Sequence, residues 1–297
     1  MEKLSIVITS SNEPKTIGKA IESFTGQKIK ENYELIIVAP DKETWKIVDS
    51  YSKKDRRIKL FKDQAKGKSS AINLVLPHLK GEIIILSDGD VSVLNNSINE
   101  IVKKFRDKKT GCVSGRPVPQ NSKKNIFGYW SHLLCNAAHE LREKRARKNE
   151  FLECSGYLWA FRTKVIRKFP VDVAEDTIVP IMFYLKNYKI KYASEAKVFV
   201  KYPDNLKDFL EQKRRAAGSH ENIGRYVNPR QIPRMKTFLN ELLGSFSLFF
   251  FASSLKEFFY TLLLFPFRFY IWVNLFYNTS FRNKRYTDKW RRVESTK

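Results

Sequence analysis

Short apolar runs alternate with amphipathic segments along the first hundred residues. Four aliphatic runs occur, at residues 4–9, 34–39, 58–61 and 83–87. Such runs, bounded by polar residues or glycine, are typical of strands buried in a parallel sheet. Segments with helical spacing lie between them, at residues 14–24, 44–51 and 69–79. This alternation predicts an α/β fold, in which helices flank a mostly parallel sheet with right-handed crossovers.

The middle of the chain is less regular. Residues 113–119 and 197–200 have the composition of strands, whereas residues 125–147 and 206–219 have the spacing of helices. The first of these helices ends in a basic run at residues 142–148, which is explained as a solvated helix face.

Two apolar and aromatic stretches follow, at residues 242–255 and 258–281, separated by a Lys-Glu pair. A membrane-spanning helix needs about 20 apolar residues. The first stretch is shorter than that, and Arg268 interrupts the second, where a charge is costly. We therefore expect C-terminal amphipathic helices that lie in the membrane interface, between about residues 238 and 281, with the basic tail on the anionic cytosolic leaflet. Two membrane crossings, or a helical hairpin packed on the domain, are the alternatives.

Length and charge narrow the possible partners. The chain has 297 residues and a formal net charge of +24, from 55 Lys and Arg against 31 Asp and Glu. That length suggests one large domain or two halves that share a sheet, and the positive charge suggests nucleic acid, an anionic bilayer or phosphate groups. The three cysteines form no CxxC pair, so we expect buried thiols and a reducing compartment. No secretory signal opens the chain, so we expect the N-terminal domain in the cytosol.

Two carboxylates follow the most apolar of the predicted strands. Asp88 and Asp90 lie just past residues 83–87, at the edge where open α/β sheets bind ligands. Two acids one residue apart can share a hard divalent cation such as Mg²⁺ or Mn²⁺, which in turn can clamp a diphosphate. An acidic turn without a ligand is the alternative, because Asp and Gly favour turns.

Several short motifs occur in order along residues 4–220. They are Ile-Val-Ile-Thr-Ser-Ser-Asn-Glu at 6–13, Val-Ala-Pro-Asp at 38–41, Lys-Gly-Lys-Ser-Ser-Ala-Ile-Asn at 66–73, Asp-Gly-Asp at 88–90, Glu-Asp at 175–176 and Gln-Lys-Arg-Arg at 212–215. In this order they resemble the family 2 glycosyltransferases, which have the GT-A fold. The resemblance implies transfer of a sugar from a nucleotide donor, with inversion at the anomeric carbon. It also suggests a nucleotide-sugar-binding half at 1–105 and an acceptor-binding half of the same domain at 106–235, while the apolar stretches and basic tail described above suggest membrane-associated helices at 236–297.

At the diphosphate end of the donor, the resemblance implies three binding residues. It places the metal on Asp90, and it places Asp88 against the nucleotide sugar or the hydrated metal. Lys68 matches a family lysine that pairs with phosphate or base, although an exposed lysine without a role is the alternative. A metal at this position stabilises the negative charge on the departing nucleoside diphosphate.

At the nucleoside end, the resemblance implies four more binding residues. It places Thr9, Ser11 and Glu13 around the base and ribose, and Asp41 against the base. Two of these residues have structural alternatives. Glu13 can favour the dipole at the start of a helix, and Asp41 can cap the helix at residues 44–51.

The acidic pair Glu175-Asp176 supplies the catalytic base in the resemblance, normally through the aspartate. A carboxylate that takes a proton from the acceptor hydroxyl accelerates transfer by about 10²–10⁴-fold. Capping of a helix that begins at Thr177 is an alternative role for Asp176, and the two roles are compatible. Gly156 lies in a small-residue segment that resembles the part of the family that borders the acceptor.

The segment at residues 212–216 resembles the Gln-x-x-Arg-Trp motif of membrane-linked polysaccharide synthases. Arg215 aligns with the family arginine, which implies a bidentate hold on the diphosphate. Gln212 and Arg214 are placed by the same resemblance at the acceptor and diphosphate end. Ala216 stands where the family has a tryptophan that shapes the acceptor end, which argues against processive polymer synthesis.

Three functions are compatible with these features. The first is an inverting, Mg²⁺- or Mn²⁺-dependent glycosyltransferase that takes a UDP- or GDP-sugar. It acts on a lipid-linked or glycan acceptor at the cytoplasmic face of the cell membrane, as a monotopic or peripheral protein. The second is a processive polysaccharide synthase, and the third is a non-catalytic basic module that binds nucleic acid or anionic membrane. The third has no use for two acidic pairs, and no nucleic-acid-binding motif is visible, so we expect no nucleic-acid partner.

Overall fold

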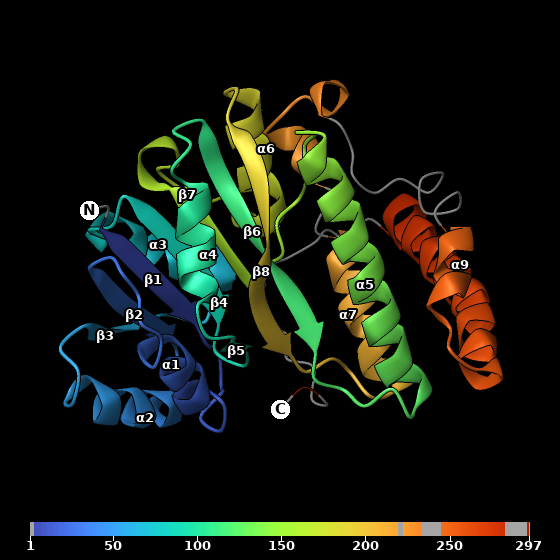
Figure 1. Cartoon of the computed structure of the whole chain (residues 1–297), viewed down its shortest axis with the longest axis horizontal. Helices are drawn as coiled ribbons and strands as arrows, with labels where there is room; N and C mark the ends of the chain where they lie inside the picture. Colours follow the sequence, from blue (N-terminus) through green and yellow to red (C-terminus); the bar gives the residue numbers. More distant parts are fainter. Residues whose placement is uncertain (1–2, 219–221, 233–244, 283–295, 297) are drawn as a thin grey trace.

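A mixed sheet forms the centre of the computed structural model, which describes residues 3–218, 222–232, 245–282 and 296. Within these residues the sheet has eight strands, in the order β3-β2-β1-β4-β7-β6-β8-β5 (Figure 1). The strands are β1 (Leu4–Thr9), β2 (Tyr33–Ala39), β3 (Ile58–Lys62), β4 (Ile83–Asp88), β5 (Ser92–Val93), β6 (Thr110–Pro119), β7 (Leu158–Arg162) and β8 (Lys189–Val200). The predicted α/β fold class is confirmed.

Strands β1, β2, β3 and β4 form the parallel half of the sheet, as the apolar runs predicted. Leu4 of β1 pairs with Tyr33 of β2 and with Ile83 of β4, so these three strands begin at one level. Because parallel strands point the same way, their carboxyl ends meet at one edge of the sheet. That edge carries Thr9 at the end of β1 and Asp88 at the end of β4.

The other half of the sheet is mixed. β7 runs antiparallel to both of its neighbours, β4 and β6, whereas β8 runs parallel to β6 and antiparallel to β5. The sequence did not predict β7, a five-residue strand whose Leu-Trp-Ala-Phe run is fully buried and whose place depends on pairing with β4 and β6. In the pairing of β4 with β7, Ser87 lies opposite Leu158. The segment ahead of β7, with Gly156, is therefore brought to the end of β4.

Helices cover both faces of the sheet. They are α1 (Ile17–Thr25), α2 (Lys42–Ser52), α3 (Lys68–Val75), α4 (Ser97–Lys104), α5 (Ile126–Arg147), α6 (Glu175–Leu185), α7 (Leu206–Gly218) and α9 (Leu255–Arg282). Short 3₁₀ turns lie at Leu76–His78, Thr163–Val165, Ile223–Arg225, Pro229–Gln231 and Ser245–Phe251. Side chains of α1, α2 and α4 pack against one face, and those of α3 and α6 against the other. The sequence interpretation missed α4, although its buried residues Ile98, Ile101 and Val102 have helical spacing.

The C-terminal helix α9 packs beside α5 and α7 (Figure 1). The hydroxyls of Tyr129 and Thr261 lie 2.7 Å apart, and the Trp130 indole N–H donates to the Tyr260 carbonyl at 2.6 Å. Leu264 is buried in the same cluster. One side of α9 is therefore part of the folded domain.

The Lys-Glu pair at 256–257 lies in the first turn of α9 and does not separate two helices. Among the residues that the structure describes, no helix is both long enough and apolar enough to cross a bilayer. Residues 238–244 and 283–295, which belong to the expected membrane-associated part and basic tail, lie outside the described residues.

Candidate functional site

The carboxyl ends of β1 and β4 form the first part of the site. The Thr9 hydroxyl lies 3.4 Å from both the Ser87 carbonyl oxygen and Asp88 Oδ1, and the Gly89 amide donates to the Thr9 carbonyl at 2.9 Å. A Cβ atom at Gly89 would lie only 2.6 Å from Glu13 Oε2, so only a glycine allows this close approach. Three of the predicted donor-binding residues, Thr9, Glu13 and Asp88, are thereby brought together.

The segment after β1 is held by its own polar contacts. The buried Ser10 hydroxyl donates to Glu13 Oε2 at 2.8 Å, and the Glu13 amide donates to the Thr44 hydroxyl at 3.3 Å. The Ile17 amide, at the start of α1, donates to the Glu13 carbonyl at 3.0 Å, so Glu13 lies one turn ahead of the helix and its helix-dipole role stays an alternative. Ser11 is half-buried on the same segment.

Asp41 caps α2, which was the structural alternative for this residue. Its Oδ1 accepts from the Thr44 amide at 2.8 Å, and its Oδ2 accepts from the Asn12 amide at 2.9 Å. A contact with the nucleobase stays a prediction.

Asp63, which the sequence did not single out, follows β3 as Asp41 follows β2. Its Oδ2 is buried and lacks a hydrogen-bond partner in the described part of the chain, and burial, together with the charge of Asp41, raises the pKa of Asp63.

Lys68 links this edge to the acidic pair. Its Nζ lies 2.6 Å from Asp88 Oδ1 and 3.0 Å from Glu175 Oε1, and it donates to the Gly156 carbonyl at 2.9 Å. Burial by itself lowers the pKa of Lys68, but the neighbouring carboxylates raise it above its ordinary value, so the side chain stays a cation. With only 12% of its side chain exposed, Lys68 is not a surface lysine without a role.

The acidic pair lies at the amino end of α6. The helix begins at Glu175 after the cap residue Ala174, so Asp176 lies in the first turn and is not the cap. The positive end of the helix dipole favours carboxylates in this turn. Glu175 is only 4% exposed and pairs with Lys68, whereas Asp176 is half-buried beside Gly156. Asp176 is therefore the carboxylate that a substrate hydroxyl reaches more easily.

Tyr157 lies in the segment expected to border the acceptor, although the sequence interpretation did not single it out as a candidate site residue. The Gln212 side-chain amide donates to its hydroxyl at 3.4 Å. Burial raises the pKa of Tyr157 and the charge of Asp90 adds to the rise, while Arg215 opposes it. Asp90 and Arg215 therefore lie within electrostatic range of one phenol. One feature of the sequence could have indicated this position: Tyr157 follows a glycine and precedes β7, which pairs with β4.

Helix α7 supplies the remaining candidates. Gln212 is half-buried, and its Oε1 is buried without a hydrogen-bond partner among the described residues. Arg214 and Arg215 are exposed. In the part of the chain that the structure describes, neither Arg214 nor Ser11 forms a hydrogen bond or ion pair with another candidate residue, so their roles rest on the resemblance alone.

The end of β4 fits a divalent cation. Asp88 and Asp90 are both half-buried, and carboxylate oxygens are the ligands that Mg²⁺ and Mn²⁺ prefer. Within the described residues, Asp88 meets Lys68 and Thr9 through Oδ1, which leaves Oδ2 for a cation. No group of three or more His, Cys, Asp or Glu side chains suited to a metal occurs in this part of the chain. Substrate phosphate and water would complete the shell, as is usual for Mg²⁺.

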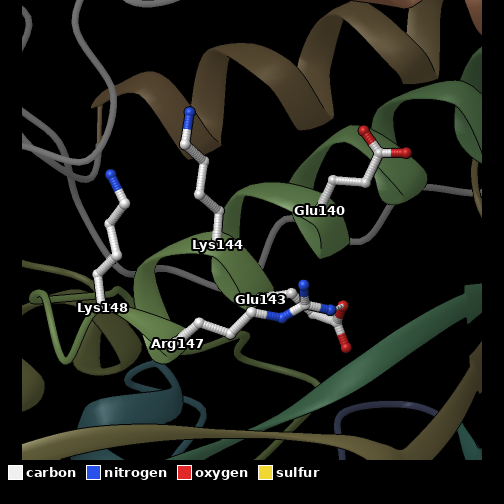
Figure 2. A pocket seen from close by; sticks show the side chains of 5 residues that line it. All are labelled: Glu140, Glu143, Lys144, Arg147 and Lys148. Atoms are coloured by element: carbon white, nitrogen blue, oxygen red, sulfur yellow. Dashed lines mark hydrogen bonds and ion pairs between the residues drawn. The ribbon is translucent and has the colours of Figure 1, made fainter.

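A depression on α5 is separate from these residues. Its volume is about 360 Å³, and Figure 2 shows its lining: Glu140, Glu143, Lys144, Arg147 and Lys148. Arg147 pairs with Glu143 at 3.2 Å on the same helix. The basic run is not wholly a solvated face, however, because Arg142 is buried and donates to the Glu153 carbonyl at 3.0 Å. The depression is a charged helix surface and shares no residue with the candidate site.

The model of the family described as "Glycosyl transferase family 2" matches residues 5–169, which is more than half of the chain. The chain belongs to glycosyl transferase family 2. The match contains Lys68, Asp88 and Gly156, and it ends before the acidic pair. Membership of this family favours a glycosyltransferase over the non-catalytic basic module.

Curated relatives of this glycosyltransferase include enzymes that transfer or polymerise N-acetylglucosamine. An "N-acetylglucosaminyltransferase" of Neorhizobium galegae is 24% identical over 242 residues, which cover 74% of this chain and 55% of the relative. A "Poly-beta-1,6-N-acetyl-D-glucosamine synthase" of Staphylococcus aureus (strain COL) is 24% identical over 239 residues, with 74% and 55% covered. The chain thus spans about half the length of the curated relatives it matches.

Two solved structures share the fold. A mannosyltransferase from Pyrobaculum calidifontis, solved with GDP-Man and Mn²⁺, has a TM-score of 0.62 at 18% identity and covers 92% of this chain and 83% of its own. S. aureus TarS 1–349, solved with UDP-GlcNAc, has a TM-score of 0.53 at 16% identity and covers 86% and 77%. At these identities the likeness shows the fold, and the expected GT-A fold is confirmed.

Proposed function

We propose that this glycosyltransferase moves a sugar from a UDP- or GDP-sugar to a hydroxyl of a lipid-linked or glycan acceptor, with inversion and with Mg²⁺ or Mn²⁺. The observation that most supports this proposal is the Lys68 ammonium, which touches Asp88 on one side and Glu175 on the other. It joins the donor-side carboxylates and the acidic pair in one site. The donors present in the two solved structures, GDP-Man and UDP-GlcNAc, support a nucleotide-sugar substrate.

Asp176 is the general base of the proposed reaction. Its carboxylate takes the proton of the acceptor hydroxyl while the acceptor oxygen bonds to the anomeric carbon, from the side opposite the diphosphate. The bond from the anomeric carbon to the diphosphate oxygen breaks, and the nucleoside diphosphate leaves with the electron pair. Asp88 and Asp90 would hold a divalent cation, which would supply Lewis-acid stabilisation of that leaving group. A single displacement of this kind inverts the anomeric configuration.

A donor screen tests the proposal. We expect nucleoside diphosphate release from at least one member of a panel of UDP- and GDP-sugars with Mn²⁺, faster when a lipid-linked or oligosaccharide acceptor is added. NMR of the product should show the inverted anomer. Products with one added sugar are expected, because Ala216 replaces the family tryptophan. Absence of release from every donor contradicts the donor class, a retained anomer contradicts single displacement, and a ladder of longer products indicates a processive synthase.

Gly156 sets the space in front of the proposed base. A Cβ atom there would lie 2.9 Å from Asp176 Oδ2. Among the described glycines, Gly67 has a positive φ and Gly156 does not, so the backbone of Gly156 can accept an alanine. We therefore expect Gly156→Ala to displace the Asp176 carboxylate without backbone strain. A misplacement of about 1 Å can cost about 10²-fold in rate, so kcat should fall by about that factor. Thermal melting within a few degrees of the parent, together with parent-level turnover, would show that this carboxylate has room to move without loss.

We further propose that the outer side of α9 binds an anionic membrane. Its apolar side chains there, with Phe250 just before the helix, are between 41% and 92% exposed; they are Phe250, Leu255, Phe258, Phe259, Leu262, Leu263, Phe269, Tyr270 and Val273. Cations border this surface: Lys123 Nζ lies 4.6 Å from the Phe251 ring centre, and Lys256 Nζ lies 5.5 Å from that of Tyr260. Burial of apolar area at about 25 cal/mol per Å² provides most of the binding energy, and each basic residue near the headgroups adds about 1 kcal/mol.

Flotation with lipid vesicles tests the membrane proposal. We expect the parent to float with vesicles that contain phosphatidylserine, less so at high salt because salt screens the basic residues. A triple variant that removes one stripe of apolar side chains at helical spacing should stay in solution; its substitutions are Leu255→Ser, Phe259→Ser and Leu263→Ser. The matched control, Leu74→Ser, Leu185→Ser, Leu206→Ser, changes exposed leucines elsewhere and should float like the parent. A parent that stays at the bottom of the gradient with both anionic and neutral vesicles overturns the proposal.

A further inference from the structure

Three protein acceptors surround the ammonium of Lys68. An ammonium has three N–H groups, and three acceptors lie within hydrogen-bond distance of this one: Asp88 Oδ1 at 2.6 Å, Glu175 Oε1 at 3.0 Å and the Gly156 carbonyl at 2.9 Å. They come from β4, from α6 and from the segment ahead of β7. No donor of this cation is therefore left for a phosphate, unless a contact with the protein breaks first.

We propose that Lys68 is a positioning residue, which holds the donor-side carboxylate Asp88 and the amino end of α6 at a fixed separation, and that it is not a ligand of the diphosphate. The inference rests on the proposed function, since it takes Asp88 to face the donor and α6 to carry the base. It replaces the phosphate or base contact that the family resemblance implied for Lys68.

The Lys68 ammonium affects the position of Asp176 through two of its contacts. Glu175, which it binds, is the first residue of α6, and Asp176 is the second, so a shift of the helix start moves the base. Gly156, whose carbonyl it also binds, lies directly against the Asp176 carboxylate. Without Lys68, the buried Glu175 carboxylate would lose its cation while Asp88 kept its own negative charge nearby, a costly arrangement of like charges.

Lys68 is presented from a fixed backbone. It is the first residue of α3, and the residue before it, Gly67, has a φ of 108°, which glycine adopts without strain. Ala71, Ile72 and Val75 anchor the helix in the core, where all three are fully buried. The backbone that carries Lys68 is therefore fixed, and its side chain, which is only 12% exposed, has little room to leave its three partners.

Melting of the ligand-free chain tests the contact itself. Lys68→Met leaves the Glu175 carboxylate buried without its cation and should lower the melting temperature, whereas adding Glu175→Gln removes that stranded charge. We therefore expect the double variant to melt at a higher temperature than Lys68→Met alone. Lys66→Met, which changes an exposed lysine two residues earlier, is the matched control and should melt like the parent. A double variant that melts at or below the temperature of Lys68→Met overturns the inference.

Ligand binding and turnover distinguish positioning from phosphate binding. With Mn²⁺, we expect Lys68→Met to change the Kd values of UDP and UMP, or of GDP and GMP, by the same factor. The kcat for donor hydrolysis should fall about 10- to 100-fold, as when the support of a metal ligand is removed, with KM close to that of the parent. The inference is overturned if Lys68→Met binds UDP or GDP about tenfold or more weakly than the parent but binds UMP or GMP as the parent does. If the parent binds neither UDP nor GDP, the proposed function fails, and the melting comparison still decides whether Lys68 holds the two acids.

Discussion

Asp176→Asn is expected to lose sugar transfer by about 10²–10⁴-fold, the usual contribution of a general base, while it keeps donor binding. The amide has the shape of the carboxylate but cannot accept the acceptor proton. The contacts of Lys68 go to Glu175 Oε1 and Asp88 Oδ1, so this substitution leaves that bridge in place. Initial rates of nucleoside diphosphate release, with Kd values for UDP and GDP in Mn²⁺, measure the two effects separately.

Two variants serve as controls for this result. Asp204→Asn changes an exposed acid ahead of α7 and should leave both rate and affinity at the parent level. Glu175→Gln keeps the base and weakens only its support, so its loss of rate should be smaller than that of Asp176→Asn. Near-parent transfer by Asp176→Asn would move the base to another residue, and loss of donor affinity would make Asp176 a donor ligand.

Asp90→Ala is expected to remove most turnover together with Mn²⁺-dependent nucleotide binding. The two carboxylates at the end of β4 are the proposed cation ligands, and loss of one would weaken the hold on the metal. Stabilisation of a leaving-group charge by one preorganised group is worth about 10²–10³-fold in kcat, so a loss of that size is expected. Manganese binding followed by electron paramagnetic resonance should fall in parallel.

Removal of the metal from the parent provides the matching experiment. Excess EDTA should reduce the parent to about the activity of Asp90→Ala, and added Mn²⁺ or Mg²⁺ should restore the parent only. Circular dichroism melts of both proteins verify that the fold is kept. Full activity in EDTA, or in Asp90→Ala, would show that the reaction needs no cation at this position.

The parallel half of the sheet was predictable because its strands are buried on both faces. The residues of β1 from Leu4 to Ile8 have no exposed side, so the sequence carries an unbroken signal. β7 has the same kind of burial but only five residues, with a tryptophan and a terminal arginine. Its position depends on pairing with β4 and β6, which no local pattern encodes.

The site was predictable where it follows strand ends and unpredictable where it depends on long-range contacts. Asp88 could be found because carboxyl ends of parallel strands share one edge. The ion pair between Lys68 and Glu175 joins α3, which packs on β1 and β2, to α6, which packs on β6 and β8. Strands β4 and β7 lie between these two pairs in the sheet, so only the folded chain reveals the contact. Tyr157 was missed for the same reason, since its partner Gln212 comes from a helix near the other end of the domain.

The hydrogen bonds between α9 and α5 fix the position of α9 relative to the rest of the domain. Because Tyr129 meets Thr261 and Trp130 meets the Tyr260 carbonyl, α9 packs directly on the catalytic body. If α9 rests on a bilayer as proposed, the height of Asp176 above the lipid headgroups is then set by the fold. Acceptor hydroxyls at that height meet the base, while those on a shorter or a longer spacer miss it. Acceptor choice would then depend on the length of the lipid-linked group as well as on its chemistry.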